Sequence, residues 1–302
     1  SSDLTWNCTS QIVSLTVPIN NNITVLGNCN ISSTGSGKLA LTDTNTSYAM
    51  TISGDFTQTG GTFILNNGLS STVTNYLYVA GDFQFTGGTI TEFSSTGRGA
   101  IVFNGNGVMQ TYSSGGTFQN TIDFRVEPGA YLQLGSGQVP AYITLSKGTF
   151  TLSAGATLGI TSPYGITLSS TANPSGGNIR VTGTRTYDSG ANYIFNGNVS
   201  QYTGDGLPAT VNALNFNNNG GSIRFLKAHT ITNDFSITSG SRTNLGTFSH
   251  STSFLSLGGE SQPGGSYGGT TSGADFEIPE YFDEVTGIIN NNPPIGTWLG
   301  NT

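Results

Sequence analysis

Charge is scarce in this sequence of 302 residues, in which Asp, Glu, Lys and Arg together make up 8%. The 9 basic residues form no stripe and all lie at or before Arg242, so the electrostatic footprint of a nucleic-acid-binding protein is missing. No apolar run approaches the roughly 20 residues of a transmembrane helix, which predicts no membrane span. Ala and Leu are sparse, and Gly interrupts nearly every window with helical spacing, so helices are not expected.

The residues that are abundant in the sequence indicate short β-strands. It has 44 Gly, 17 Phe and 12 Tyr, which is enough aromatic surface for a core and too much for a disordered chain. Many short stretches alternate apolar and polar residues and end in Gly, Asn, Asp or Ser, as strands with one buried face do. Examples are NYLYVAG (75–81), AIVFNG (100–105) and NIRVTG (178–183). The chain is therefore predicted to be all-β.

Internal repeats indicate how these strands are arranged. GDFTQTGGTFIL (54–65) returns as GDFQFTGGTITEF (81–93), and SSGGTFQNTIDF (113–124) is a weaker third copy. A longer pattern opens with Phe-Asn-Gly-Asn at Phe103 and again at Phe195, with a Gln and a Tyr soon after. The period from Gly54 to Gly81 is of the size typical of solenoids. We predict a right-handed parallel β-helix in a single elongated domain; a pair of irregular β-sandwiches is the alternative, because Asn-Gly turns also suit hairpins.

The C-terminal part differs in composition from the rest. Residues 275–302 hold five acidic residues and no basic one, and they include a Pro-Pro pair. We expect a solenoid over residues 1–250, followed over 251–302 by closing strands and an acidic, Pro-containing tail. Because the end of a solenoid exposes unpaired strand edges, this tail is expected either to cap the last coil or to donate a strand to another chain.

The two cysteines are a candidate disulfide. The distance along the sequence from Cys8 to Cys29 is close to one coil, so they could stack on adjacent turns and pair. Such a bond would stabilise the fold by roughly 3 kcal/mol in the chain-entropy model and would indicate an oxidising compartment. The alternative is a pair of unlinked, buried small residues.

Residues that could carry chemistry are few. Only His229 and His250 could serve as an imidazole base, and neither follows a nucleophile motif, so no catalytic histidine is expected. Asp55 and Asp82 occupy the same place in successive repeats. That equivalence favours a turn role, in which each carboxylate caps nearby backbone amides, over a paired-carboxylate site.

The acidic stretch of the tail is the best candidate for a cation or partner contact. Calcium prefers several oxygen ligands, but the spacing matches no known calcium loop, and a solvated acidic edge is the alternative. The residues concerned are Asp275, Glu277, Glu280, Asp283 and Glu284. No other cofactor is expected.

Several phrases resemble the repeat-rich surface proteins of Bacteroidetes that are exported by the type IX system. The phrases are GDFTQTGGTF (54–63), KGTFTLSAGATLGI (147–160) and LSLGGESQPGGSYGGTTSGA (255–274), and the resemblance covers about residues 52–290. It implies an extracellular or cell-surface protein with a β-helical passenger. No type IX sorting domain is recognisable, so the chain is expected to be a fragment or a processed product.

These observations together predict a function. We expect a secreted or cell-surface, adhesin-like or structural module without enzymatic activity. Its partners would be other surface or secreted chains, including copies of itself, and glycans. The alternative, from a different class, is a polysaccharide lyase or glycoside hydrolase, because solenoids of this kind also host such enzymes.

Overall fold

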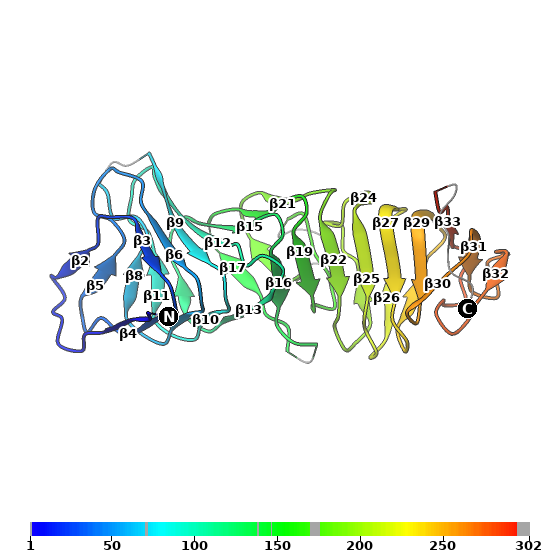
Figure 1. The fold of residues 1–302 in the computed structure, drawn as a ribbon, viewed down its shortest axis with the longest axis horizontal. Helices are drawn as coiled ribbons and strands as arrows, with labels where there is room; N and C mark the ends of the chain where they lie inside the picture. Colours follow the sequence, from blue (N-terminus) through cyan, green and yellow to red (C-terminus); the bar gives the residue numbers. More distant parts are fainter. Residues whose placement is uncertain (1, 70–71, 138, 146, 170–175, 295–302) are drawn as a thin grey trace. The chain divides into compact units, whose positions relative to one another are not determined.

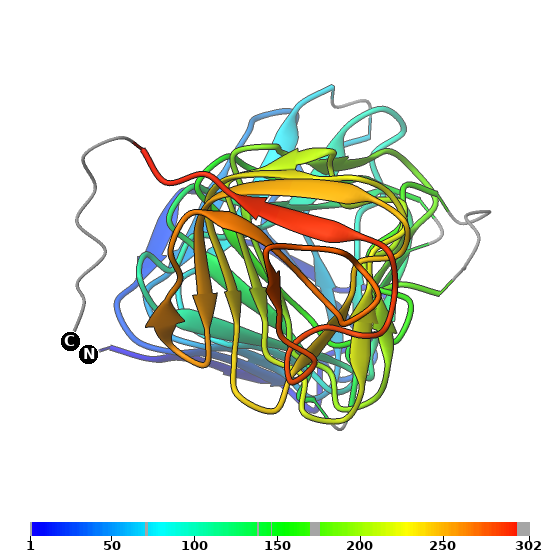
Figure 2. The same cartoon turned by 90° about the vertical axis from the view of Figure 1, so that its right-hand side faces the viewer.

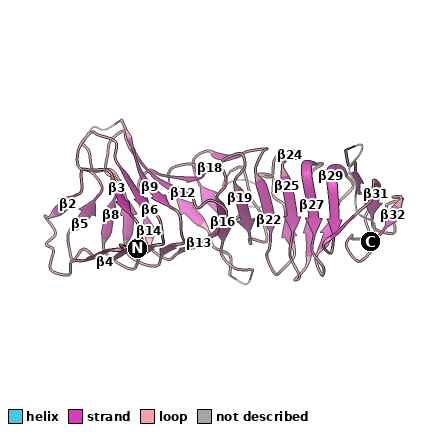
Figure 3. Cartoon of the chain, viewed as in Figure 1, coloured by secondary structure: helices cyan, strands magenta, loops and turns pink. Residues whose placement is uncertain are grey.

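The computed structural model describes residues 2–69, 72–137, 139–145, 147–169 and 176–294. Within these ranges it contains strands and loops and no helix (Figure 3). Nearly all strand pairs are parallel and join segments from successive coils. The prediction of an all-β parallel β-helix is therefore confirmed, since hairpin-built sandwiches would pair their strands antiparallel.

Residue contacts divide the chain into two compact units. Unit 1 comprises Ser1–Gln133, Tyr142–Thr151 and Ile179–Thr186, and unit 2 comprises Leu134–Ala141, Leu152–Asn178 and Tyr187–Thr302. The strands β16 (Tyr131–Leu134), β18 (Phe150–Leu152) and β21 (Arg185–Tyr187) each extend across a unit boundary.

In unit 1 each coil contributes one strand to each of three sheets, whose parallel strands lie side by side in Figure 1. The first sheet has the order β1 (Leu4–Asn7), β4 (Cys29–Ser33), β7 (Phe56–Gln58), β10 (Phe83–Phe85) and β13 (Met109–Ser114). The second is β2 (Thr16–Pro18), β5 (Lys38–Ala40), β8 (Thr62–Ile64), β11 (Thr89–Thr91) and β14 (Thr117–Phe118). The third is β3 (Ile23–Val25), β6 (Ala49–Ile52), β9 (Thr74–Val79), β12 (Arg98–Phe103) and β15 (Ile122–Val126), and it continues through β18 and β21. A separate pair joins β17 (Ile143–Leu145) to β20 (Ile179–Val181).

The core of unit 1 is a ladder of inward side chains, one from each coil. Cys29, Phe56, Phe83 and Tyr112 pair in register across β4, β7, β10 and β13. The rings of Phe56 and Phe83 stack with centroids 5.0 Å apart, and those of Phe83 and Tyr112 with centroids 5.6 Å apart. Burying each of these rings stabilises the fold by roughly 1.5–3 kcal/mol. The repeated Gly-Asp-Phe phrase is the sequence trace of this ladder.

A second ladder, made of Asp and Asn side chains, connects the coils at the start of the first sheet. Asp3 Oδ1 accepts a hydrogen bond from the backbone N–H of Asn28 (2.8 Å), and Asn28 Oδ1 accepts one from Asp55 (2.9 Å). Asp55 in turn accepts from Asp82 (2.8 Å), and Asp82 from Thr111 (2.7 Å). The prediction that Asp55 and Asp82 cap backbone amides is confirmed, but the prediction that these amides are local is wrong. Each side chain caps an amide of the next coil and not of its own turn.

Glycine precedes the ladder residues because this close approach leaves no room for a side chain. A Cβ atom at Gly54 would lie 2.3 Å from Asn28 Oδ1, and one at Gly81 would lie 2.3 Å from Asp55 Oδ1. The Gly-Asp-Phe phrase therefore combines three functions in consecutive positions. Gly leaves room for the side-chain oxygen of the previous coil, Asp supplies the acceptor oxygen for the next coil, and Phe packs in the core.

The longer repeat has an equally specific basis. Gln110 is buried, and its amide nitrogen donates to the carbonyls of Val79 (2.8 Å) and Gly81 (2.7 Å) while its oxygen accepts from Gly105 N–H (2.9 Å). Gln201 repeats the arrangement with the carbonyls of Ile160 and Ser162 and with the N–H of Gly197. The Phe-Asn-Gly-Asn blocks are therefore equivalent corners. Each is fixed by a buried Gln that satisfies backbone groups which water cannot reach.

Unit 2 is built from shorter coils. Tyr193 pairs with Leu214, and Leu214 with Phe235. Its first sheet has the order β19 (Thr157–Ile160), β22 (Asn192–Phe195), β25 (Ala213–Phe216), β27 (Thr230–Ile237), β29 (Ser249–Leu257), β33 (Ile288–Asn291), β31 (Gly265–Gly268) and β32 (Phe276–Glu277). Beside it, β24 (Thr210–Val211) pairs with β27 and β30 (Glu260–Ser261) pairs with β29. The second sheet is β23 (Gln201–Tyr202), β26 (Ser222–Arg224) and β28 (Arg242–Asn244).

The C-terminal segment folds back on the last coils. The expected boundary at residue 250 falls inside β29, which continues the parallel sheet. The edge of β29 is then paired by β33, which Figure 2 shows alongside it, and Ile289 of β33 is fully buried. Residues 295–302 of the predicted tail lie outside the described residues.

The predicted disulfide between Cys8 and Cys29 is absent, and both thiols are free. Cys29 pairs in register with Leu4, whereas the N–H of Cys8 bonds to the carbonyl of Ser33. The first coil is longer than the stretch that separates the two cysteines. Cys8 is therefore displaced by about four strand residues, roughly 13 Å, from the position facing Cys29, and a disulfide needs Cα atoms within about 7 Å.

We expect Asp55→Ala to lower the free energy of unfolding by about 1–2 kcal/mol, because the N–H of Asp82 loses its acceptor. Asp55→Asn should be close to neutral, since Asn28 already performs the same role one coil earlier. Urea denaturation of both variants tests this. Equal destabilisation by Asn and Ala would show that the charge matters and the ladder does not.

The two thiols should differ sharply in reactivity in the native protein. Cys8 is exposed, while Cys29 is 1% exposed and burial raises its pKa to about 12, so it holds almost no thiolate at neutral pH. Iodoacetamide should label one site in native protein and two in urea, as read by mass spectrometry. A native mass two hydrogens lower than the reduced mass would show that the two cysteines form a disulfide after all.

Candidate functional site

The five acidic residues of the tail are not brought together. Asp275 Oδ2 accepts hydrogen bonds from the N–H (3.0 Å) and hydroxyl (2.9 Å) of Ser266, which hold its pKa below the usual range. Glu284 accepts from the hydroxyl of Thr270, and Glu277 and Glu280 are exposed. The described residues contain no group of three His, Cys, Asp or Glu side chains arranged to hold a metal ion. The calcium hypothesis therefore finds no ligand set there.

The two histidines lie in the core of unit 2. His229 and His250 are 2% and 1% exposed, and their rings stack in parallel with centroids 6.0 Å apart. His229 Nδ1 faces the carbonyl of Pro208 at 2.8 Å, which makes it the protonated nitrogen, while His250 Nδ1 accepts from the N–H of His229 at 3.2 Å. Burial is the main cause that lowers the pKa of both imidazoles to about 4. They are neutral structural groups at neutral pH.

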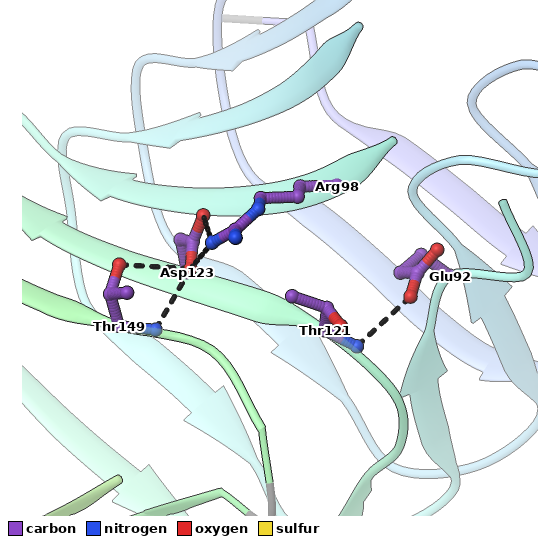
Figure 4. Close-up of polar contacts among 5 residues, drawn as sticks. All are labelled: Glu92, Arg98, Thr121, Asp123 and Thr149. Carbon is purple, nitrogen blue, oxygen red and sulfur yellow. Dashed lines mark hydrogen bonds and ion pairs between the residues drawn. The ribbon is translucent and has the colours of Figure 1, made fainter. Parts of the chain in front are cut away.

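Unit 1 contains a buried carboxylate with an incomplete set of partners (Figure 4). Glu92 is 3% exposed; its Oε1 accepts from the N–H of Thr121 at 3.0 Å, and its Oε2 has no hydrogen-bond partner. Burial raises the pKa of Glu92, although the backbone N–H groups of Thr121 and Ser94 and the positive charges of Lys147 and Arg98 oppose the rise. A carboxyl with a raised pKa is the group that a general acid requires.

The neighbouring carboxylate of Asp123 has a different environment. Its Oδ1 accepts from the N–H and the hydroxyl of Thr149 at 2.8 and 2.9 Å, and Arg98 pairs with it at 3.3 Å (Figure 4). Thr149 belongs to the next coil, so Asp123 serves the same coil-to-coil function as the ladder of Asp55 and Asp82. Its lone pairs are already used by the fold.

A groove on unit 2 is a further candidate. A cavity of about 440 Å³ is lined by Arg224, Asn244, Phe248 and Val285 among others, and an adjoining cavity of about 280 Å³ by Tyr202, Ser222, Arg224, Asn244 and Asp283 among others. Arg224 and Asn244 line both, so we treat the two as one site and call it the Arg224 groove. It lies over the outward side chains of β23, β26 and β28.

The parallel register places the polar side chains of the groove in rows. Tyr202, Arg224 and Asn244 pair across the three strands. Asp283 continues the row, because its N–H bonds to the carbonyl of Thr243 at 2.9 Å. A second row contains Ser222 and Arg242, which are paired in the same way. Neighbouring side chains in a row are about 4.8 Å apart.

Asp283 organises one end of the groove. Its Oδ1 accepts from Ser222 Oγ (2.9 Å) and pairs with Arg242 Nε (3.3 Å), and its Oδ2 accepts from Asn244 Nδ2 (3.2 Å). Asp283 thus differs from the other acidic residues predicted as contacts, because it lines a cavity. Its charge there is matched by Arg242 and is not free for a cation.

Sequence reasoning missed Arg224 and Glu92. Tyr202 and Arg224 pair in the structure, but their offset along the chain matches no repeat visible in the sequence. The alternation in Ser222-Ile223-Arg224, with Ile223 buried and Arg224 exposed, is a signal that could have placed the guanidinium outside. Glu92 resembles any polar residue at the end of a strand, and its burial becomes evident only from the coil that follows.

We expect the stability of the fold to fall as pH decreases from about 7 to about 4. The unfolded chain binds protons on both imidazoles near pH 6.5 while the folded chain does not until about pH 4, so the difference is roughly 3 kcal/mol for each histidine. His229→Phe should remove about half of this histidine-linked slope, whatever it does to absolute stability. Urea midpoints across pH, with NMR titration of the ring protons, test this. Native imidazole signals that titrate near pH 6.5 would contradict it.

Comparison with known proteins identifies no relative. No protein-family model matches the chain, and no curated protein or solved structure matches it either. The resemblance to Bacteroidetes surface proteins therefore stays a prediction, and the function has to be derived from the side chains described above.

Proposed function

We propose that this chain is a secreted or cell-surface β-solenoid that acts by binding, as an adhesin-like or structural module, and catalyses no reaction. The proposal is supported mainly by the carboxylates, which the fold already uses as hydrogen-bond acceptors. The carboxylates of Asp3, Asp55, Asp82 and Asp123 bind backbone amides of the following coil. Side chains committed to holding coils together are not available to move protons on a substrate.

The histidines support the same proposal. A general base needs an accessible nitrogen near its substrate. His229 and His250 line a cavity of about 310 Å³, but their ring nitrogens either face backbone groups or are buried without a partner. The described residues contain no helix long and apolar enough to cross a membrane. The extracellular location rests on the resemblance of the repeat phrases alone, because the free thiols remove the disulfide as an indication of an oxidising compartment.

A carbohydrate-active enzyme is the second candidate, and Glu92 is the observation in its favour. Its raised pKa and its unpartnered Oε2 fit a proton donor. Two observations favour a structural role instead. The side chain is nearly inaccessible, and Oε1 holds the N–H of Thr121, which belongs to the next coil.

A panel of polysaccharides separates the two candidates. We expect no new reducing ends and no unsaturated products absorbing in the ultraviolet after prolonged incubation with the protein. Turnover that disappears in Glu92→Gln, while that variant unfolds at the same urea concentration as the wild type, would replace the binding role with catalysis. Asp123→Asn is the matched control, because it alters a neighbouring carboxylate that is already saturated by Thr149 and Arg98.

A further inference from the structure

The Arg224 groove contains a positive charge that the fold does not neutralise. Five of the six arginines contact a described partner: Arg98, Arg125 and Arg242 pair with acids, Arg185 with the carbonyl of Val181, and Arg180 with the ring of Tyr142. The guanidinium of Arg224 has no hydrogen bond or ion pair with any described residue, and the side chain is exposed.

The charge distribution of unit 2 makes this position unusual. The unit holds nine acidic residues against three basic ones, which are Arg224, Lys227 and Arg242. Both arginines lie on the three-stranded sheet of the groove. Because Arg242 is matched by Asp283, one unit of positive charge remains there in otherwise acidic surroundings. Such a site attracts an anionic group and steers it to one place.

The chemistry of the groove suits a carboxylate as the bound anion. A guanidinium presents a planar fork of donors that fits a carboxylate with two parallel hydrogen bonds. A single free arginine is too little for nucleic acid, whose affinity comes from many phosphate contacts. Asn244 and Ser222, which Asp283 holds in place, add an amide and a hydroxyl of the kind that bind sugar hydroxyls.

The geometry narrows the ligand further, to a saccharide chain. Tyr202 lies next to Arg224 in the same row, and Phe248 lines the larger of the two cavities together with Arg224. Aromatic rings of this kind pack against the apolar faces of sugar rings. The spacing of about 4.8 Å between neighbouring side chains in the row is comparable with the length of one pyranose unit. A chain lying across the strands would therefore meet one side chain for each sugar.

A peptide fits this surface less well. Extended peptides bind sheets by adding a strand at an edge, where main-chain groups are free. Here β26 is paired on both sides, with β23 and β28, so a ligand lying across the three strands meets side chains only.

We propose that the Arg224 groove binds an oligosaccharide of uronic acids, with one sugar carboxylate on Arg224 and a sugar ring against Tyr202. The inference rests on the proposed binding role and gives it a ligand class. Arg224 supplies the charge, Tyr202 the stacking surface, and Asp283 is a positioning residue that holds Asn244, Ser222 and Arg242.

The test is isothermal titration of short oligogalacturonates, oligomannuronates, oligoguluronates and oligoglucuronates, each as the free acid and as its methyl ester. At least one free acid should bind, and its ester should bind at least tenfold more weakly, since the ester keeps the ring and loses the charge. Arg224→Gln should weaken binding of the acid by roughly 10- to 100-fold and leave the ester unaffected. Tyr202→Ala should weaken both.

Matched variants and products separate the outcomes. Arg125→Gln removes an exposed arginine in unit 1 that is paired with Glu127, and it should leave binding unchanged. Absence of binding by every oligouronide, equal affinity of acid and ester, equal affinity of Arg224→Gln and wild type, or preference for oligoglutamate over every saccharide would each overturn the inference. Chromatography of the same samples reports cleavage. Cleaved products would refute the non-enzymatic role while leaving the Arg224 site in place.

Discussion

The fold depends on one interaction, the hydrogen bond between a group of one coil and the backbone of an adjacent coil. Parallel strands supply most of these bonds, but at the corners the strands end and backbone amides would be left without partners. The Asp and Asn ladder from Asp3 to Asp82 and the buried glutamines Gln110 and Gln201 fill those positions. An unpaired buried amide costs about 1–3 kcal/mol, so the corners decide whether the coils can stack.

This constraint explains why several of the few acidic residues occupy specific positions between successive coils. The carboxylates of Asp55, Asp82, Glu92 and Asp123 are acceptors for the next coil. An Asn can replace an Asp in this role, as Asn28 does. A surface that contacts a ligand has to come from side chains that the corners do not use. The Arg224 groove meets that condition, because its arginine faces outward from a strand paired on both sides and the guanidinium makes no hydrogen bond or ion pair with any residue that the structure describes.

Much of the fold could be predicted because the ladder residues repeat in the sequence. Gly54-Asp55-Phe56 and Gly81-Asp82-Phe83 show the register of adjacent coils directly, and the Phe103 and Phe195 blocks mark equivalent corners. The prediction for the cysteines was wrong because coil length varies. The coil from Phe56 to Phe83 is longer than the coil from Tyr193 to Leu214, so a spacing that suits unit 2 does not place Cys8 beside Cys29. The same variation concealed the row of Tyr202 and Arg224.

The Asp ladder also has a direction. Each oxygen belongs to the earlier coil and each amide to the later one, from Asp3 to Asn28, Asp55, Asp82 and Thr111. A new coil therefore docks onto an acceptor that is already in position, and no coil waits for one that has yet to emerge. A chain that emerges N-terminus first, from a ribosome or through a narrow pore, can therefore complete the hydrogen bonds of each coil as soon as that coil has emerged.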